Sequence, residues 1–336
     1  MRPASGSPPG SISPPPKRTG VARRGASCAS ADLRGVESGR VTAAAPVLPL
    51  RVGLAGAGPW GQKAYAPFLA AGPETRLAGV WARRFEAATA IAAAHGTEAV
   101  DSFDALLERC EAIAFAVPPD VQVELAIRAA RAGKHLMLDK PLALDLGEAR
   151  RLTRAIEESG VVSQLMLTQR YRPAVRSFIE SARGFGAIGA RLAFLSGAFL
   201  RGPYATPWRR EHGALHDLGP HAFDLLEAAL GPIERIVGRG DPRQWVGLTC
   251  THAGGAVSEL ALSGVMDLPQ TVFRVDLYGP KGALEFDVAA ASAESPWPAV
   301  RSSFAEAVRT GRSPALDVHR GLEIQVLIDR ALRALE

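Results

Sequence analysis

A glycine-rich turn between an apolar strand and a helical segment constrains the fold more than any other stretch. Residues 51–55 have the length and composition of a buried strand, and Gly-Ala-Gly-Pro-Trp-Gly follows directly at residues 56–61. In this G-x-G-x-x-G spacing the first glycine permits a tight turn, the second lets backbone approach a pyrophosphate, and the third lets helix and strand pack closely. The following helix would direct free N–H groups at the phosphates. We therefore predict dinucleotide contacts from Gly56, Ala57, Gly58, Pro59, Trp60 and Gly61.

Helical and strand patterns alternate after this turn. Helical patterns cover residues 62–71, 86–95, 103–110, 121–132 and 142–160, and strand patterns cover residues 76–82, 112–117, 134–138 and 161–168. The run at 112–117 is apolar throughout, which suits a parallel strand covered on both faces. The alternation predicts an α/β fold that begins with a Rossmann domain, a doubly wound parallel sheet with the cofactor across the carboxyl ends of its strands.

The end of the second predicted strand bears on the choice of cofactor. Enzymes that use NAD usually place Asp or Glu there, about 20 residues beyond the last glycine, to bind the 2′-hydroxyl of the adenosine ribose. Here Ala82 is followed by Arg83 and Arg84. Arginine binds phosphate through paired, charge-assisted hydrogen bonds, so we predict cofactor contacts from these three residues and favour NADP over NAD. The alternatives are that Arg84 is only solvated and that Arg83 only stacks on the adenine.

The N-terminal segment differs in composition from the rest of the chain. Residues 1–47 cluster Pro, Ser, Gly, Ala and Arg, with no acidic residue before Asp32. Such a segment cannot bury enough apolar surface to offset its ordering entropy, so we predict a disordered extension. The remaining residues, roughly 290, exceed one typical domain. We expect a dinucleotide-binding domain at 48–168 and a second domain at 169–336.

Composition also narrows the classes of protein. No apolar run approaches the roughly 20 residues of a membrane span, so we expect no membrane insertion. The 3 cysteines are scattered, which fits a reducing compartment, and we expect a cytoplasmic protein. Nucleic-acid binding is not indicated, because the chain has no basic helix or patch of basic and aromatic residues.

Several motifs in a fixed order make the chain resemble the glucose-fructose oxidoreductase, inositol dehydrogenase and rhizopine-catabolism (Gfo/Idh/MocA) family. They are the early G-x-G-x-x-G, Val-Pro-Pro at 117–119, Ala-Gly-Lys-His at 132–135 leading into Asp-Lys-Pro at 139–141, and Gly-Ala-Leu-His-Asp-Leu-Gly-Pro-His at 213–221. The resemblance extends from roughly residue 50 to the C-terminus.

The resemblance implies roles around the cofactor. Relatives use the lysine of a Glu-Lys-Pro motif near the nicotinamide ribose and the reacting carbon, which here is Lys140, with Asp139 in place of Glu. They often have a cis peptide before the proline, so we predict one between Lys140 and Pro141. Thr168 stands where relatives commonly have Asn. The cofactor contacts implied in this way are Val117, Pro118, Pro119, Asp139, Lys140 and Thr168.

Asp217 and His221 are the remaining candidates for catalysis. They are four residues apart, which places them on the same side of a helix, and an ordinary polar helix face is the alternative. By resemblance they match the family's active-site Asp and His. His221 would be the general base, because imidazole titrates near neutral pH. Asp217 would hold the substrate hydroxyl or orient the imidazole, and Lys140 would stabilise negative charge on the substrate oxygen.

The neighbouring residues carry weaker signals. Trp208-Arg209 resembles a pair that some relatives place against the cofactor, and a buried Trp beside a surface Arg is the alternative. His212 and His216 match no family position with a known task. A zinc site built from His212, His216, Asp217 and His221 is possible on spacing alone, but relatives use none and no cysteine supports it, so we expect no metal.

The second domain shows strands that follow one another with short turns, at 190–199, 233–239, 245–251, 256–263 and 271–278. They predict an α+β domain with an open, mostly antiparallel sheet, one face of which needs a cover. Relatives often use this sheet as a subunit interface, which implies a homodimer or homotetramer. Residues 287–301 are short where relatives carry a longer loop. The C-terminal helix, 322–335, is expected to pack in the core and back on the first domain.

The leading hypothesis is an NAD(P)-dependent dehydrogenase or reductase that moves a hydride between nicotinamide and a secondary alcohol or ketone of a sugar, inositol or related polyol. One alternative is a glycosidase that uses transient oxidation by a retained cofactor. The other is a regulator that senses dinucleotides without catalysis, and the presence of all three candidate catalytic residues argues against it.

Overall fold

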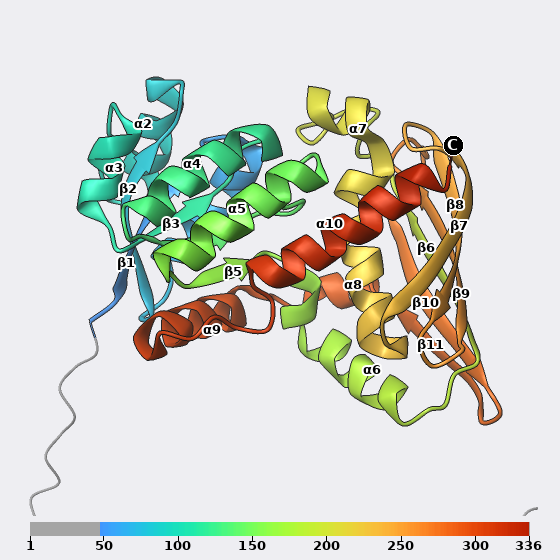
Figure 1. Cartoon of the computed structure of the whole chain (residues 1–336). Helices are drawn as coiled ribbons and strands as arrows, with labels where there is room; N and C mark the ends of the chain where they lie inside the picture. Colours follow the sequence, from blue (N-terminus) through green and yellow to red (C-terminus); the bar gives the residue numbers. More distant parts are fainter. Residues whose placement is uncertain (1–47, 336) are drawn as a thin grey trace, which may run out of the picture. The chain divides into compact units, whose positions relative to one another are not determined.

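The structure is a computed structural model that describes residues 48–335. It holds a parallel sheet built from the first part of the chain and a larger mixed sheet built from the second (Figure 1). The predicted fold class, a Rossmann sheet followed by an α+β part with an open, mostly antiparallel sheet, is confirmed. The predicted disordered extension, residues 1–47, lies outside the described residues.

The first sheet has 5 parallel strands in the order β2-β1-β3-β4-β5. Their bounds are Leu50–Ala55 (β1), Thr75–Trp81 (β2), Ala112–Phe115 (β3), His135–Leu138 (β4) and Ser163–Leu165 (β5). Strand β3 is buried at every residue, as expected for a parallel strand covered on both faces. Strand β1 lies between β2 and β3, so the strand order reverses there, and in such sheets ligands bind at the carboxyl ends beside the reversal.

The helices of this part are Ala66–Ala70 (α1), Phe85–Ala94 (α2), Phe103–Arg109 (α3), Pro119–Arg131 (α4) and Leu146–Ser159 (α5). Two starts, those of α1 and α5, differ from the predictions by more than two residues. A π-helical turn, Gly61–Tyr65, precedes α1, since Pro67 has no N–H with which to continue regular α-helical bonding. Helix α5 begins at Leu146 and not at Leu142, because the Asp145 carboxylate accepts a hydrogen bond from the Glu148 N–H at 2.9 Å and caps it.

The second sheet has 6 strands in the order β11-β10-β6-β9-β8-β7, and all neighbours are antiparallel except β6 and β9. Their bounds are Gly189–Leu195 (β6), Ile233–Asp241 (β7), Trp245–His252 (β8), Val257–Ser263 (β9), Val272–Gly279 (β10) and Gly282–Asp287 (β11). Helices contact β7, β8 and β9 from one face only (Figure 1). The opposite face carries no helix within residues 48–335.

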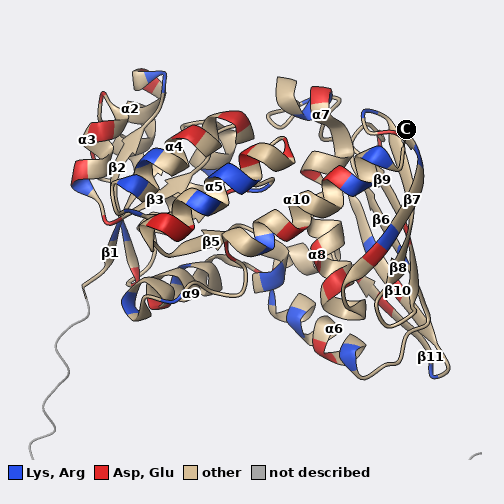
Figure 2. Ribbon diagram, viewed as in Figure 1, with Lys and Arg blue, Asp and Glu red and all other residues tan. Residues whose placement is uncertain are grey.

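The helices of the second part are Pro173–Arg183 (α6), Pro207–Asp217 (α7), Gly219–Leu230 (α8), Trp297–Thr310 (α9) and Val318–Arg333 (α10). Neither α6 nor α9 was predicted, and α9 begins inside the stretch expected to be a loop. In Figure 2, Lys and Arg are interspersed with Asp and Glu along the helices of both parts.

The prediction that Asp217 and His221 share one helix is wrong. Asp217 is the last residue of α7, and His221 lies in the first turn of α8. Pro220 has no N–H to donate, so regular helical bonding is interrupted at this point. Gly213 breaks α7 as well, with φ of 73°.

The C-terminal helices contact the first part of the chain. Trp297 of α9 stacks on Phe68 of α1, with ring centroids 4.9 Å apart. Arg301 of α9 forms an ion pair with Glu74 at 3.2 Å and donates a hydrogen bond to the Phe68 carbonyl at 3.2 Å. Helix α10 packs against α5. The chain therefore crosses to the second sheet and returns to the first.

The glycine-rich turn supplies a test of the fold. Gly56 has φ of 116°, and a Cβ there would lie 2.3 Å from the Ala116 carbonyl oxygen, whereas a Cβ on Gly58 would meet nothing within 4 Å. Gly56→Ala should therefore lower the free energy of unfolding by about 1–3 kcal/mol, while Gly58→Ala should change it by less than about 0.5 kcal/mol. Denaturant unfolding of both variants checks this, and equal losses would contradict it.

Candidate functional site

A cavity of about 460 Å³ lies at the carboxyl ends of the first sheet. The loops after β1, β2, β3 and β4 and the start of α7 line it, so it joins residues from both parts of the chain. Of the residues predicted from the sequence, it brings together Gly58, Pro59, Trp60, Arg83, Val117, Pro118, Pro119, Asp139, Lys140, Trp208 and Arg209.

The other predicted residues do not line this cavity. Gly56 and Gly61 form the turn beneath it, where a Cβ on Gly61 would lie 2.6 Å from the Gly56 carbonyl oxygen. Arg84 is exposed at the start of α2, and Thr168 is buried at the start of a 3₁₀ turn, Thr168–Tyr171. The other predicted residues that do not line the cavity are Ala57, Ala82, Asp217 and His221.

Sequence reasoning missed several residues of the cavity wall. Asp120, in the first turn of α4, lines it, as do Tyr204, Glu211 and His212 from the second part of the chain. Only Asp120 gave a usable signal, because it directly follows the strand-end motif Pro118-Pro119. The others come from the chain just before and within α7, and their approach depends on tertiary structure.

Lys140 and Asp217 form an ion pair beside the cavity. The Lys140 Nζ donates to the Asp217 Oδ1 at 2.8 Å and to the Asp217 backbone carbonyl at 2.7 Å. The two side chains are only 15% and 9% exposed. Burial alone would raise the pKa of Asp217, but the charges of Lys140 and Arg209 outweigh burial and lower it to about 2. Asp217 is therefore ionised throughout the physiological pH range.

A buried glutamine fixes the backbone before Lys140. The Gln122 Nε2 donates to the Asp139 carbonyl at 2.9 Å, and the Asp139 N–H donates to the Gln122 Oε1 at 2.7 Å. The peptide bond between Lys140 and Pro141 is cis, as predicted. Burial raises the pKa of Asp139 to about 6 against the opposing charge of Lys140. Gln122 was not predicted, because its role depends on packing of α4 against the end of β4.

His221 lies in an environment that disfavours its charged form. Burial and then the charge of Lys140 lower its pKa to about 3, partly offset by Asp217. The expectation of titration near neutral pH is therefore wrong, and the imidazole is neutral at pH 7. Its Nδ1 is buried and has no hydrogen-bond partner within residues 48–335. No hydrogen bond joins it to Asp217 in this part of the chain, so both imidazole nitrogens are unengaged by that carboxylate.

His216 is a packed histidine. It is 4% exposed, and its Nε2 and Nδ1 lie 3.0 and 3.3 Å from the carbonyl oxygens of Leu144 and His212. Burial lowers its pKa. Across the described residues, no group of three or more His, Cys, Asp and Glu side chains is arranged to hold a metal ion, and none of the helices there is long and apolar enough to cross a membrane.

The residues at the cavity fit a dinucleotide. The space over Gly58 is open, which leaves room for a pyrophosphate against the backbone. Arg83 lies on the cavity wall beyond β2, where the adenosine ribose is bound in this architecture. The Lys140 ion pair lies at the end of β4. These features define a dinucleotide-binding domain of the oxidoreductase class.

Comparison with known proteins agrees with this class. Residues 50–167 match the model of an oxidoreductase family with an NAD-binding Rossmann fold. This match assigns residues 50–167, the dinucleotide-binding part of the chain, to the Gfo/Idh/MocA family.

Two curated relatives illustrate the range of the family. A dTDP-3,4-didehydro-2,6-dideoxy-alpha-D-glucose 3-reductase of Streptomyces violaceoruber is 33% identical over 202 residues, which are 57% of this chain and 58% of that protein. The chain thus matches less than two thirds of the reductase. An inositol 2-dehydrogenase of Rhizobium meliloti is 26% identical over 256 residues, which are 70% of this chain and 75% of the relative.

Solved structures share the fold. A UDP-N-acetylglucosamine 3-dehydrogenase of Acidithiobacillus ferrooxidans superposes with a TM-score of 0.76 at 22% identity, covering 86% of this chain and 99% of that chain. A dehydrogenase of Bordetella pertussis, determined with NADH and UDP-GlcNAcA, superposes with a TM-score of 0.76 at 20% identity, covering 85% of this chain and 95% of that chain. At these identities the likeness shows the fold alone.

Proposed function

We propose that the protein is an NAD(P)-dependent oxidoreductase that transfers a hydride between nicotinamide and a secondary alcohol or ketone of a sugar, inositol or related polyol. The buried Lys140–Asp217 pair beside the dinucleotide cavity carries the proposal, because it is a preorganised hydrogen-bond donor at the place where the reacting carbon would lie. Relatives named as a nucleotide-sugar reductase, an inositol dehydrogenase and a nucleotide-sugar dehydrogenase support the substrate class.

Each side chain has a role in this proposal. When bound, the nicotinamide supplies the hydride acceptor or donor. Two hydrogen bonds hold the Lys140 ammonium on Asp217, and its third N–H donates to the substrate oxygen and stabilises developing negative charge. Neutral His221 accepts the hydroxyl proton during oxidation and returns it during reduction. Asp217 remains ionised and holds Lys140 in place.

We also propose which part of the chain binds each ligand and in which cellular compartment the protein is located. Residues 48–168 bind the dinucleotide, and residues 169–336 bind the substrate and form subunit contacts. A cytoplasmic location is supported by Cys110 and Cys250, which are buried and form no disulfide bond within residues 48–335.

A substrate assay tests the reaction. Wild-type protein is incubated with NADP⁺ or NAD⁺ and with myo-inositol, levoglucosan or UDP-N-acetylglucosamine, and reduced nicotinamide is followed by absorbance. His221→Ala should lower turnover by about a hundredfold or more, because the proton acceptor is lost, with little change in cofactor affinity.

His319→Ala is the control for this assay, since that histidine is exposed on α10. Turnover of His221→Ala at the wild-type rate would remove His221 from the mechanism. Net hydrolysis of a glycoside without consumption of added cofactor would favour a glycosidase. Dinucleotide binding without any turnover of sugars would favour a sensor.

NADP is the favoured cofactor. Arg83 lies on the cavity wall and Arg84 is exposed one residue further on, and no carboxylate follows β2 directly. Two guanidinium groups at this end of the strand suit a 2′-phosphate better than a 2′-hydroxyl.

Titration with NADPH and NADH, followed by nicotinamide fluorescence, tests this preference. Arg83→Ala with Arg84→Ala should weaken NADPH binding by tenfold or more, about 1.4 kcal/mol, and leave NADH binding within about threefold. Arg76→Ala with Arg131→Ala removes the same charge at exposed positions away from the cavity and should affect neither. Equal weakening of both cofactors by the first pair would refute the phosphate assignment.

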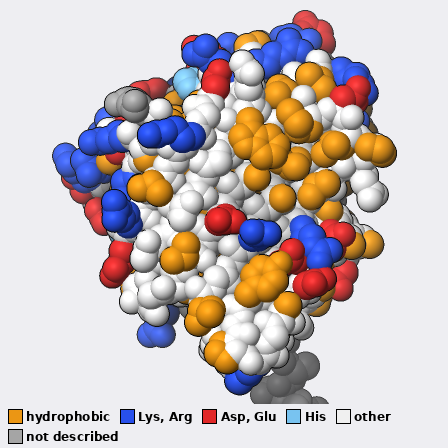
Figure 3. All heavy atoms as spheres, turned by 90° about the vertical axis from the view of Figure 1, so that its right-hand side faces the viewer, with side chains coloured by type: hydrophobic (Ala, Val, Ile, Leu, Met, Phe, Trp, Pro, Cys, Tyr) orange, Lys and Arg blue, Asp and Glu red, His pale blue; other side chains and the backbone are white. Residues whose placement is uncertain are grey.

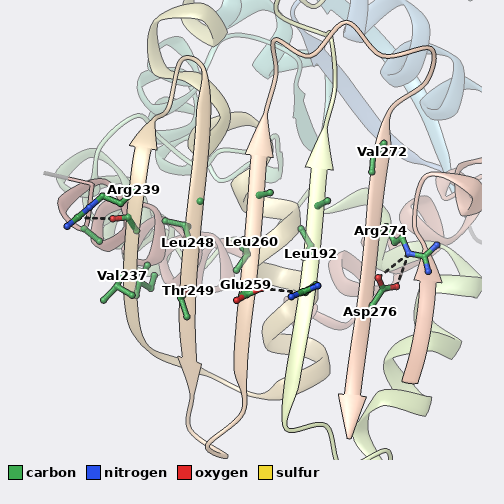
Figure 4. Close-up of a pocket in the computed structure, with 17 residues that line it drawn as sticks. Leu192, Val237, Arg239, Leu248, Thr249, Glu259, Leu260, Val272, Arg274 and Asp276 are labelled. Carbon is green, nitrogen blue, oxygen red and sulfur yellow. Dashed lines mark hydrogen bonds and ion pairs between the residues drawn. The ribbon is translucent and has the colours of Figure 1, made fainter. Parts of the chain in front are cut away.

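The uncovered face of the second sheet is the proposed subunit interface. Small residues meet in register across its middle, where Gly247 pairs with Ala261 and Ala261 with Ala193. They line a shallow cavity of about 990 Å³ (Figure 4). Val237, Trp245, Val257 and Tyr278 are exposed and, by strand alternation, lie on this same face.

Charge supports a second copy of this chain as the occupant. Arg191 and Glu259 form an ion pair at 3.2 Å, and Arg274 and Asp276 form another at 2.8 Å on the same face. Figure 3 looks onto the face and shows hydrophobic side chains beside charges of both signs. A face that carries both signs can be complementary to its own copy across a two-fold axis, and exposed apolar clusters mark interaction surfaces.

Size-exclusion chromatography with light scattering, which measures the molar mass of the protein in solution, tests the interface. Wild-type protein should have twice the monomer mass or more. Ala261→Arg should give monomers, because a long charged side chain would fill the small-residue groove. Ala132→Arg, at the exposed end of α4, is the control and should leave the mass unchanged. A monomeric wild-type protein, or an unchanged mass of Ala261→Arg, would contradict the proposal.

A further inference from the structure

The guanidinium of Arg209 lies between the cavity wall and the catalytic pair. Its Nε is 3.1 Å from the Asp217 Oδ1, and its Nη1 donates to the Thr206 hydroxyl at 3.3 Å. Its Cζ lies over the ring of Trp208, 4.5 Å from the centroid, and 5.8 Å from that of Tyr204. The side chain is 17% exposed, so four neighbours fix it in a largely buried place.

Lys140 and Arg209 share one carboxylate oxygen. The Lys140 Nζ is 2.8 Å from the Asp217 Oδ1, the atom that also faces the Arg209 Nε. A carboxylate that contacts only one flexible lysine can rotate about the bonds of the aspartate side chain. The planar guanidinium, which lies over the ring of Trp208, supplies a second charged contact to this oxygen, and we expect that contact to restrict the rotation.

We propose that Arg209 is a positioning residue, which fixes the Asp217 carboxylate so that Lys140 is held with one N–H directed at the substrate oxygen. The inference rests on the proposed function for its kinetic consequence. It assigns Arg209 a task distinct from the cofactor contact that the family resemblance implies.

Arg209 also joins the Lys140–Asp217 pair to the wall of the cavity. Tyr204, which Arg209 faces, packs edge-on against Trp60 of the glycine-rich turn, with ring centroids 6.2 Å apart. Trp60, Tyr204 and Arg209 all line the dinucleotide cavity. Arg209 therefore contacts the wall of the cofactor cavity on one side and the Lys140–Asp217 pair on the other.

The test compares Arg209→Gln, Arg209→Lys and Arg210→Gln. Arg210 is the matched control, because within residues 48–335 its side chain donates hydrogen bonds only to the backbone carbonyls of Phe199 and Leu200. Binding of NADPH and NADH is followed by fluorescence, and kcat and KM are measured with whichever of myo-inositol, levoglucosan or UDP-N-acetylglucosamine the wild type oxidises. Crystal structures of the wild type and Arg209→Gln are determined as well.

Arg209→Gln should lower kcat tenfold to hundredfold, the order expected when a catalytic group is misplaced by about 1 Å, while cofactor affinity stays within about threefold. Arg209→Lys should recover part of the loss, because it restores the charge without the planar fork. Arg210→Gln should behave as wild type. In the crystal structure of Arg209→Gln, the Asp217 carboxylate should be rotated away from its position in the wild type and should no longer contact Lys140.

Three results would overturn the inference. A large loss of NADPH affinity at unchanged kcat would make Arg209 a cofactor contact. Equal losses in Arg209→Gln and Arg209→Lys with lowered melting temperature would make its role structural. An unchanged Lys140–Asp217 pair in the Arg209→Gln crystal structure would show that Arg209 does not position Asp217, and this result needs no substrate assay. If the wild type oxidises none of the substrates, the proposed function fails, and the crystal structures still decide the inference.

Discussion

The ion pair between Lys140 and Asp217 is the interaction on which the rest of the site depends. Lys140 follows the fourth strand of the parallel sheet, and Asp217 ends a helix that covers the second sheet. Removing one partner of such a buried pair leaves an uncompensated charge, which typically costs about 3–5 kcal/mol. The part of the chain that holds the parallel sheet and the part that holds α7 must therefore pack together so that Lys140 and Asp217 are in contact. The same packing places residues of the second part on the wall of the dinucleotide cavity.

Electrostatics at this meeting point separate the roles of the titratable groups. The charges of Lys140 and Arg209 keep Asp217 ionised against the effect of burial, while burial and the charge of Lys140 keep His221 neutral. The result is a fixed anion that positions the lysine and a neutral imidazole that can accept a proton. Groups whose environments push their pKa values apart in this way can take different roles in one reaction.

The two faces of the second sheet differ, and we propose a separate task for each. Helices α7, α8 and α10 contact one face. Helix α7 carries Asp217, which pairs with Lys140 of the cavity wall, and α8 carries His221. The other face presents small residues flanked by ion pairs. Because side chains alternate along each strand, one sheet can support the site with alternate residues and leave the rest for contact with a partner.

The sequence by itself determined the features that depend on local geometry. The turn at 56–61 needs glycine at fixed positions, strand ends are marked by Pro-Pro and Lys-Pro, and the apolar run of β3 specifies a buried strand. Only the tertiary structure decided the pairing of Lys140 with Asp217, 77 residues away, the contact of Arg209 with the same oxygen, and the clamp of Gln122 on Asp139. The low pKa of His221 also needed it, since burial and neighbouring charge arise from segments distant in the chain. Local patterns encode backbone conformation, whereas the chemistry of a site depends on which distant side chains packing brings together.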